Sequence, residues 1–87
     1  ILLTMKDFEI TFAKIYPDFT RDLNKSCGEL TSTEVKVCMM LKINYSNKKI
    51  LDQLNISNST LTNLRSSVRK KMGLKRSQNL SNTLVSL

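Results

Sequence analysis

Residues 46–73 read SNKKILDQLNISNSTLTNLRSSVRKKMG, which contains two stretches of helical periodicity with only three residues between them. The first stretch predicts a short helix over residues 47–54, with Ser46 as its N-cap. In the connector, Asn55 suits the left-handed conformation that ends one helix, and Ser57 suits the N-cap of the next. A short helix, a three-residue turn and a longer helix form a helix-turn-helix, so we expect this motif here.

The longer helix is predicted over residues 58–72 and has two different faces. The apolar stripe consists of Leu61, Leu64, Val68 and Met72. The opposite face consists of Ser59, Asn63, Ser66 and Lys70, flanked by Thr62, Ser67 and Arg69. Small hydrogen-bonding side chains framed by cations, with no acid among them, suit the major groove of DNA better than a solvated helix face, which usually mixes Glu with Lys. The other interpretation is a solvated face whose cations interact with the C-terminal helix dipole.

The positive charge of the chain is confined to its second half. The 87 residues include 14 Lys and Arg against 7 Asp and Glu, a formal net charge of +7. Residues 1–43 contain six basic and six acidic residues, whereas residues 44–87 contain eight basic residues and only Asp52 as an acid. This asymmetry predicts a scaffold in the first half and a surface for an anionic partner in the second. A membrane surface would require cations around an exposed apolar face, so DNA is the favoured partner.

The chain offers little for catalysis or metal binding. It contains no His, which excludes Ser-His and Cys-His catalysis within it. Cys27 and Cys38 are too few and too far apart for a zinc site, and Cys38 is expected in the core. Asp18 and Asp22 form the only carboxylate pair at i,i+4 spacing, which a solvated helix face explains. We therefore expect no enzyme activity, no metal and no cofactor.

Further helices around the motif predict an all-α fold, a small helical bundle. Two Gly and one Pro provide too little turn chemistry for a β-domain. A capping box of Thr31 and Glu34 starts a helix up to Ile43 that is apolar on nearly every side, as a central helix would be. The last helix is predicted to start at Ser77. Its apolar line, which belongs either to the core or to a dimer seam, consists of Leu80, Leu84 and Leu87.

Two helices are predicted before the capping box. The first runs from about Met5 to Tyr16 with Thr4 as N-cap. Its apolar seam, which indicates packing on its own domain, consists of Ile1, Met5, Phe8, Phe12 and Ile15. After Pro17, which ends this helix, a second helix is predicted over residues 18–26. Its buried side consists of Phe19 and Leu23.

The predicted elements suggest two parts of the chain. Residues 1–28 are expected to form an N-terminal helical extension, and residues 29–87 the helix-turn-helix domain, as one compact unit. The chain starts with Ile-Leu-Leu rather than Met, which indicates a piece of a longer protein.

The stretch from Leu30 to Leu80 resembles the DNA-binding domain of LuxR-type (GerE-type) regulators. The matching positions are Leu30-Thr31, Glu34, Val37, Leu41, Ser46-Asn47-Lys48, Ile50, Leu54, Ile56-Ser57, Thr60, Asn63, Arg65-Ser66, Lys70-Lys71 and Met72-Gly73-Leu74. The sequence departs from the family pattern where Lys49 replaces an acid, Leu51 a small residue and Asn55 the turn glycine. At Leu64 the family often has His.

The resemblance implies sequence-specific binding of double-stranded DNA by the C-terminal effector domain of a transcriptional regulator. Such domains bind as homodimers, with the helix at about 58–72 in the major groove and the last helix often at the dimer contact. Carried over by position, the base contacts are Thr62, Asn63 and Ser66. The phosphate contacts carried over in the same way are Lys48, Thr60, Arg65, Arg69 and Lys70. Arg65 lies beside the apolar stripe, so it contacts a phosphate or braces a neighbouring helix rather than reading a base.

The segment from Phe8 to Leu30, with its Tyr-Pro-Asp-Phe, resembles the helical extension of Bacteroidetes-type regulators of this family. The resemblance implies an upstream sensor or repeat region in the parent protein. We expect a cytoplasmic domain without membrane contact of its own, whether or not the parent protein is membrane-associated.

Two other functions remain open at the level of sequence. One is a helical protein-interaction or dimerisation module, which the seam from Ile1 to Ile15 and the terminal leucines would support. The other is a sigma-factor-like region that uses the same motif beside RNA polymerase.

Overall fold

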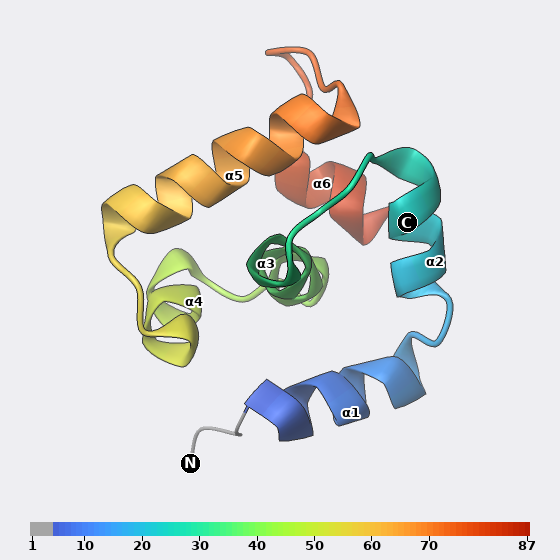
Figure 1. Ribbon diagram of the computed structural model, residues 1–87, viewed down its shortest axis with the longest axis vertical. Helices are drawn as coiled ribbons and strands as arrows, with labels where there is room; N and C mark the ends of the chain where they lie inside the picture. Colours follow the sequence, from blue (N-terminus) through green and yellow to red (C-terminus); the bar gives the residue numbers. More distant parts are fainter. Residues whose placement is uncertain (1–4) are drawn as a thin grey trace.

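The computed structural model describes residues 5–87 of the chain, and all of the regular elements in this range are α-helices (Figure 1). The helices are α1 (Met5–Ile15), α2 (Phe19–Ser26), α3 (Ser32–Lys42), α4 (Asn47–Leu54), α5 (Asn58–Met72) and α6 (Leu80–Val85). The all-α expectation is confirmed. The predicted N-cap Thr4, the seam position Ile1 and the side chain of Met5 lie outside the described part. None of the helices in residues 5–87 is long and apolar enough to cross a membrane.

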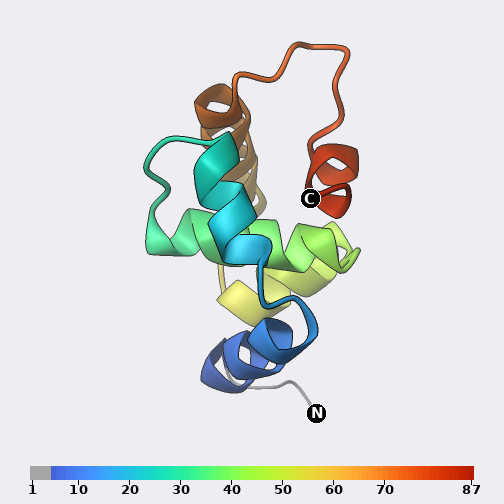
Figure 2. The same ribbon diagram turned by 90° about the vertical axis from the view of Figure 1, so that its right-hand side faces the viewer.

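Helix α3 forms the centre of the molecule, with α1 on one side and α5 on the other (Figures 1 and 2). The predicted capping box starts it, because the Thr31 amide donates to Glu34 Oε1 (2.8 Å) and the Glu34 amide donates to Thr31 Oγ1 (3.2 Å). Its apolar residues Val37, Cys38, Met39, Met40 and Leu41 are all buried, and α3 packs against both α5 and α6. This helix therefore holds the other elements in place.

Three residues in the left-handed conformation end helices and turn the chain. They are Asn44 (φ 63°), Asn55 (φ 55°) and Gly73 (φ 68°). In each case the amide of the next residue bonds back to a carbonyl five residues earlier, over 3.0–3.2 Å. These bonds are Tyr45 to Met40, Ile56 to Leu51, and Leu74 to Arg69. Asn55 adopts the conformation predicted for it, whereas Asn44 was not predicted.

The aromatic residues of α1 and α2 attach these two helices to the core. Phe8, Phe12 and Phe19 are buried, and the rings of Phe12 and Phe19 meet edge to face with centroids 5.2 Å apart. The predicted inner side of α2, Phe19 and Leu23, is confirmed. The prediction for Ile15 was wrong, because this side chain is 63% exposed. Instead, the ring of the following residue, Tyr16, packs against Phe12 at 5.1 Å.

The last helix starts later than the sequence predicts. Its N-cap is Asn79, whose side chain accepts from the Asn82 amide, and not Ser77. Ser77 lies in a turn that is closed by hydrogen bonds between Lys75 and Gln78, so the chain cannot enter a helix there. Leu80 and Leu84 are fully buried and Leu87 is half-buried against them. The leucine line of α6 therefore belongs to the core of this chain.

Candidate nucleic-acid interface

Helices α4 and α5 form the helix-turn-helix with the boundaries that the sequence predicts. The Ser46 hydroxyl accepts from the Lys49 amide and the Ser57 hydroxyl accepts from the Thr60 amide, each at 3.2 Å. Between the two helices, Ile56 packs against the core and so fixes the turn. Local capping therefore sets both the length of the turn and the direction of α5.

Helix α5 has one buried and one exposed side. Leu61 and Val68 are buried, while Leu64 and Met72 are half-buried against the core. The exposed residues on the other side include Ser59, Thr62, Asn63, Ser66 and Lys70. No acid occurs in α5, and its last turn carries Arg69, Lys70 and Lys71. The helix thus presents hydrogen-bonding groups to solvent next to cations.

A polar hollow of about 370 Å³ lies between the start of α4 and the side of α5. Its polar lining comes from Asn47, Asn58, Thr62, Arg65, Ser66 and Arg69. Four of these, Thr62, Arg65, Ser66 and Arg69, are predicted contact residues, which the fold brings together. Asn47 and Asn58 were missed, although Asn47 stands in the quoted Ser-Asn-Lys sequence and each Asn is the first residue of its helix.

The other predicted contact residues do not line this hollow. Asn63 and Lys70 are exposed on α5, and Lys48 is exposed in the first turn of α4. The Thr60 hydroxyl lies 3.0 Å from the Ser57 hydroxyl, so it takes part in the N-cap of α5. These four positions therefore lie on the two helices of the motif but outside the hollow.

Arg65 connects the two helices of the motif. Its Nη1 donates to Oδ1 of Asn47 over 3.3 Å, which joins the middle of α5 to the start of α4. The predicted bracing role is therefore present in the structure. A guanidinium carries five N–H donors, so this single bond leaves donors for a phosphate as well.

Arg69 connects α5 to the loop that precedes α6. Its Nη1 donates to the Gln78 carbonyl (2.8 Å) and its Nη2 donates to the Lys75 carbonyl (3.0 Å). Sequence reasoning missed this contact, because backbone carbonyls are the same in every residue and carry no sequence signal. Arg69 consequently holds the chain beyond Gly73 against the end of α5.

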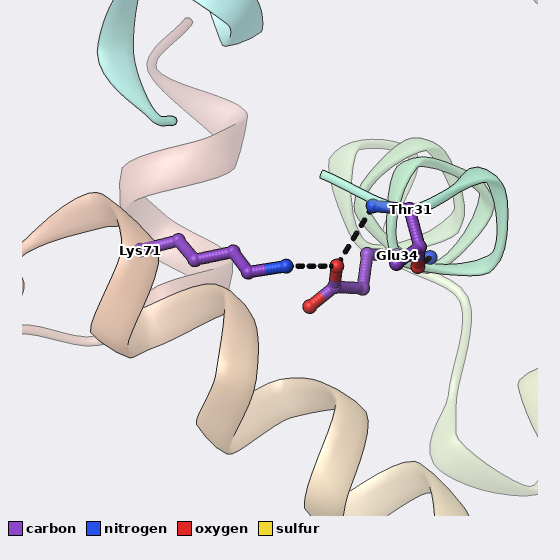
Figure 3. A network of polar contacts seen from close by, with 3 residues as sticks. All are labelled: Thr31, Glu34 and Lys71. Carbon is purple, nitrogen blue, oxygen red and sulfur yellow. Dashed lines mark hydrogen bonds and ion pairs between the residues drawn. The ribbon is translucent and has the colours of Figure 1, made fainter. Parts of the chain in front are cut away.

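Lys71 is paired inside the molecule rather than with a partner (Figure 3). Its Nζ lies 2.6 Å from Oε1 of Glu34, whose residue is only 2% exposed. Burial by itself raises the pKa of Glu34, but the hydrogen bonds from Lys71 and Thr31 and the nearby Ser67 side chain outweigh burial and lower this pKa to about 2. Both hydrogen bonds are accepted by Oε1, whereas Oε2 is buried without a hydrogen-bond partner. The pair fixes the end of α5 to the start of α3.

Two residues that depart from the family pattern make contacts within the chain. Lys49, which replaces an acid, places its Nζ 4.3 Å from the centre of the Tyr45 ring, a cation–π distance. Leu51, which replaces a small residue, is half-buried against the core. Both side chains are thus accommodated by contacts within the chain.

Comparison with known proteins agrees with this geometry. Residues 28–83 match the family described as bacterial regulatory proteins, LuxR family (GerE), and this segment includes all of α3, α4 and α5. Neither the curated proteins nor the solved structures contain a match to the chain. The helix-turn-helix of this family is a DNA-binding regulatory domain. Because the match covers well over half of its residues, this chain belongs to the LuxR family of bacterial regulatory proteins.

Proposed function

We propose that the chain recognises specific sequences in double-stranded DNA by inserting α5 into the major groove. The observation that carries this proposal is the exposed side of α5, which combines Thr62, Asn63 and Ser66 with cations and no acid. Asn pairs well with adenine, while the two hydroxyls can donate to or accept from any base. In this arrangement Thr62, Asn63 and Ser66 contact base edges.

The phosphate contacts surround these base contacts on both sides. Lys48 and Thr60 lie in the first turns of α4 and α5, and Lys70 lies in the last turn of α5. Arg65 and Arg69 line the polar hollow and keep free N–H donors beyond the bonds they make within the chain. Such contacts fix the register of the protein on the duplex, whereas the base contacts give specificity.

On DNA the domain acts as a homodimer and as the C-terminal effector of a larger cytoplasmic regulator with an upstream sensor or repeat region. The family resemblance supports the dimer, and we propose the last helix as its contact. Since Leu80 and Leu84 are buried in the core, the outer side of α6, including the 41% exposed Val85, is the surface for this contact. Two half-sites about one helical turn apart follow from such a dimer.

Fluorescence anisotropy on a labelled duplex of random sequence tests the proposal. We expect nonspecific binding at roughly 10⁻⁴–10⁻⁶ M that weakens steeply as salt rises, because phosphate contacts release counterions. The slope of log K against log salt is negative, and Lys70→Ala should reduce its magnitude by about 0.9, because one phosphate contact is lost. The variant should still bind. Lys14→Ala is the matched control, because Lys14 is exposed on α1, across α3 from α5 (Figure 1).

Absence of binding at low salt, or binding that does not depend on salt, would favour a protein-interaction module instead. An identical change of slope in Lys70→Ala and Lys14→Ala would show that net charge, and not α5, determines the affinity.

A further inference from the structure

We propose that the loop between α5 and α6 forms a second phosphate-binding site, with Arg76 as a DNA backbone contact that the family pattern does not assign. A second hollow, of about 260 Å³, lies between this loop and α5. Three arginines line it, Arg65, Arg69 and Arg76, together with the polar residues 77–79. The inference rests on the proposed DNA binding and extends the contact surface beyond the recognition helix.

The two hollows adjoin each other, because Arg65 and Arg69 line both. The first hollow contains the predicted base contacts Thr62 and Ser66, and the second contains Arg76. A DNA strand that runs along this side of α5 therefore passes from one hollow to the other.

The charges in the second hollow favour an anion. No acidic residue lines either hollow, and Asp52 is the only acid in residues 44–87. Three guanidinium groups on one hollow attract a negatively charged group, and a bound anion lowers the repulsion among them. A phosphate is the matching group, since its oxygens accept two parallel N–H bonds from one guanidinium.

The loop is fixed in place before any ligand binds. Arg69 donates to the carbonyls of Gln78 and Lys75, the Lys75 amide donates to Gln78 Oε1 (2.8 Å), and the Gln78 amide donates to the Lys75 carbonyl (3.0 Å). These bonds close a turn in which Arg76 is an exposed central residue. A side chain on such a turn binds with a smaller loss of conformational entropy than one on a free loop. Arg69 is thus a positioning residue for Arg76 in addition to its proposed phosphate contact.

The test compares Arg76→Gln with the wild-type chain on the same random duplex. Loss of one phosphate contact should reduce the magnitude of the negative slope of log K against log salt by about 0.9. It should also weaken binding roughly 5- to 10-fold near 0.1 M salt. Arg76→Lys keeps a cation on the loop and should keep most of the wild-type slope. Arg21→Gln on α2 is the matched control, since it removes one exposed arginine elsewhere and should leave the slope unchanged.

The outcomes separate this inference from the proposed function. If the wild-type chain does not bind DNA, both fail. If the wild-type chain binds DNA and Arg76→Gln keeps the wild-type slope, the proposed second phosphate-binding site is ruled out while the proposed DNA binding stands. An equal loss of slope in Arg76→Gln and Arg76→Lys would also overturn it, because the effect would then come from a disturbed loop.

A second experiment follows the amide chemical shifts of residues 75–79 while inorganic phosphate is added, and it tests whether the hollow binds a small anion instead of DNA. Tight binding of free phosphate with an unchanged DNA slope would assign the hollow to a small anion and contradict the proposal.

Discussion

Glu34 is the residue that links the start of α3 to the end of α5. Its carboxylate accepts from the Thr31 amide within the capping box and from Lys71, which is 37 positions away in sequence. The capping role could be predicted, because both partners stand in one short motif. The ion pair could not, because contacts between distant positions leave no local pattern. Lys71, counted with the surface charge in the sequence, is therefore neutralised within the molecule.

The pH dependence of stability should show the contribution of Glu34. Its pKa is about 2 in the folded chain against an ordinary value of 4.5, so the carboxylate stabilises the fold fully above about pH 4.5. This contribution, about 3 kcal/mol, is lost as the pH falls from 4.5 towards 2, where the folded state must also take up the proton. Urea unfolding of the wild-type chain should therefore show a steeper loss of stability in this range than Glu34→Gln shows.

The exposed Glu29 provides the control for this experiment. Glu29→Gln should keep the wild-type pH dependence, since it leaves the pair of Glu34 and Lys71 in place. If Glu34→Gln loses stability between pH 4.5 and 2.5 as steeply as the wild type does, the ion pair with Lys71 is not stabilising.

At the scale of the elements, the helix-turn-helix is the part that the sequence specifies best. Ser46, Asn55, Ser57 and Gly73 act on their own neighbours within one turn, so local rules predict the bounds of α4 and α5 correctly. The start of α6 was misplaced because a turn held by Arg69 delays it, and that contact is not local. The two hollows were not predictable for the same reason, since their walls come from separate elements.

The turn residue Asn55 allows a test of the motif's geometry. Its φ of 55° is left-handed, which strains a residue with a Cβ, although Asn tolerates it better than most. Asn55→Ala should lower the free energy of unfolding by about 1 kcal/mol, and Asn55→Gly, the family's usual residue, should leave it equal or higher. Chemical denaturation at neutral pH measures both changes.

Asn24→Ala is a suitable control for this comparison, because Asn24 is exposed within α2, where Ala is the better helix former. It should not destabilise the chain. Equal stability of Asn55→Ala and the wild type would mean that the turn does not hold a left-handed residue in solution.

At the scale of the whole molecule, the uneven charge coincides with the arrangement of the helices. The neutral first half contributes α1, α2 and the central α3, and the basic second half contributes the motif and the loop before α6 (Figures 1 and 2). The all-α fold and the buried and exposed sides of α5 could be predicted, because they follow from periodicity. The partners of the cations could not be predicted from the sequence, because Arg65, Arg69 and Lys71 bond to groups on other elements.

Binding-site selection from a random duplex pool measures whether α5 reads DNA bases. We expect the wild-type chain to enrich a defined sequence and Asn63→Ala to lose its preference at one base-pair position, by about 1–3 kcal/mol. Lys70→Ala should select the same sequence with lower overall affinity, since a phosphate contact is not sequence-specific. A wild-type pool without enrichment, or an Asn63→Ala pool with the unchanged wild-type preference, would show that α5 does not read bases through Asn63.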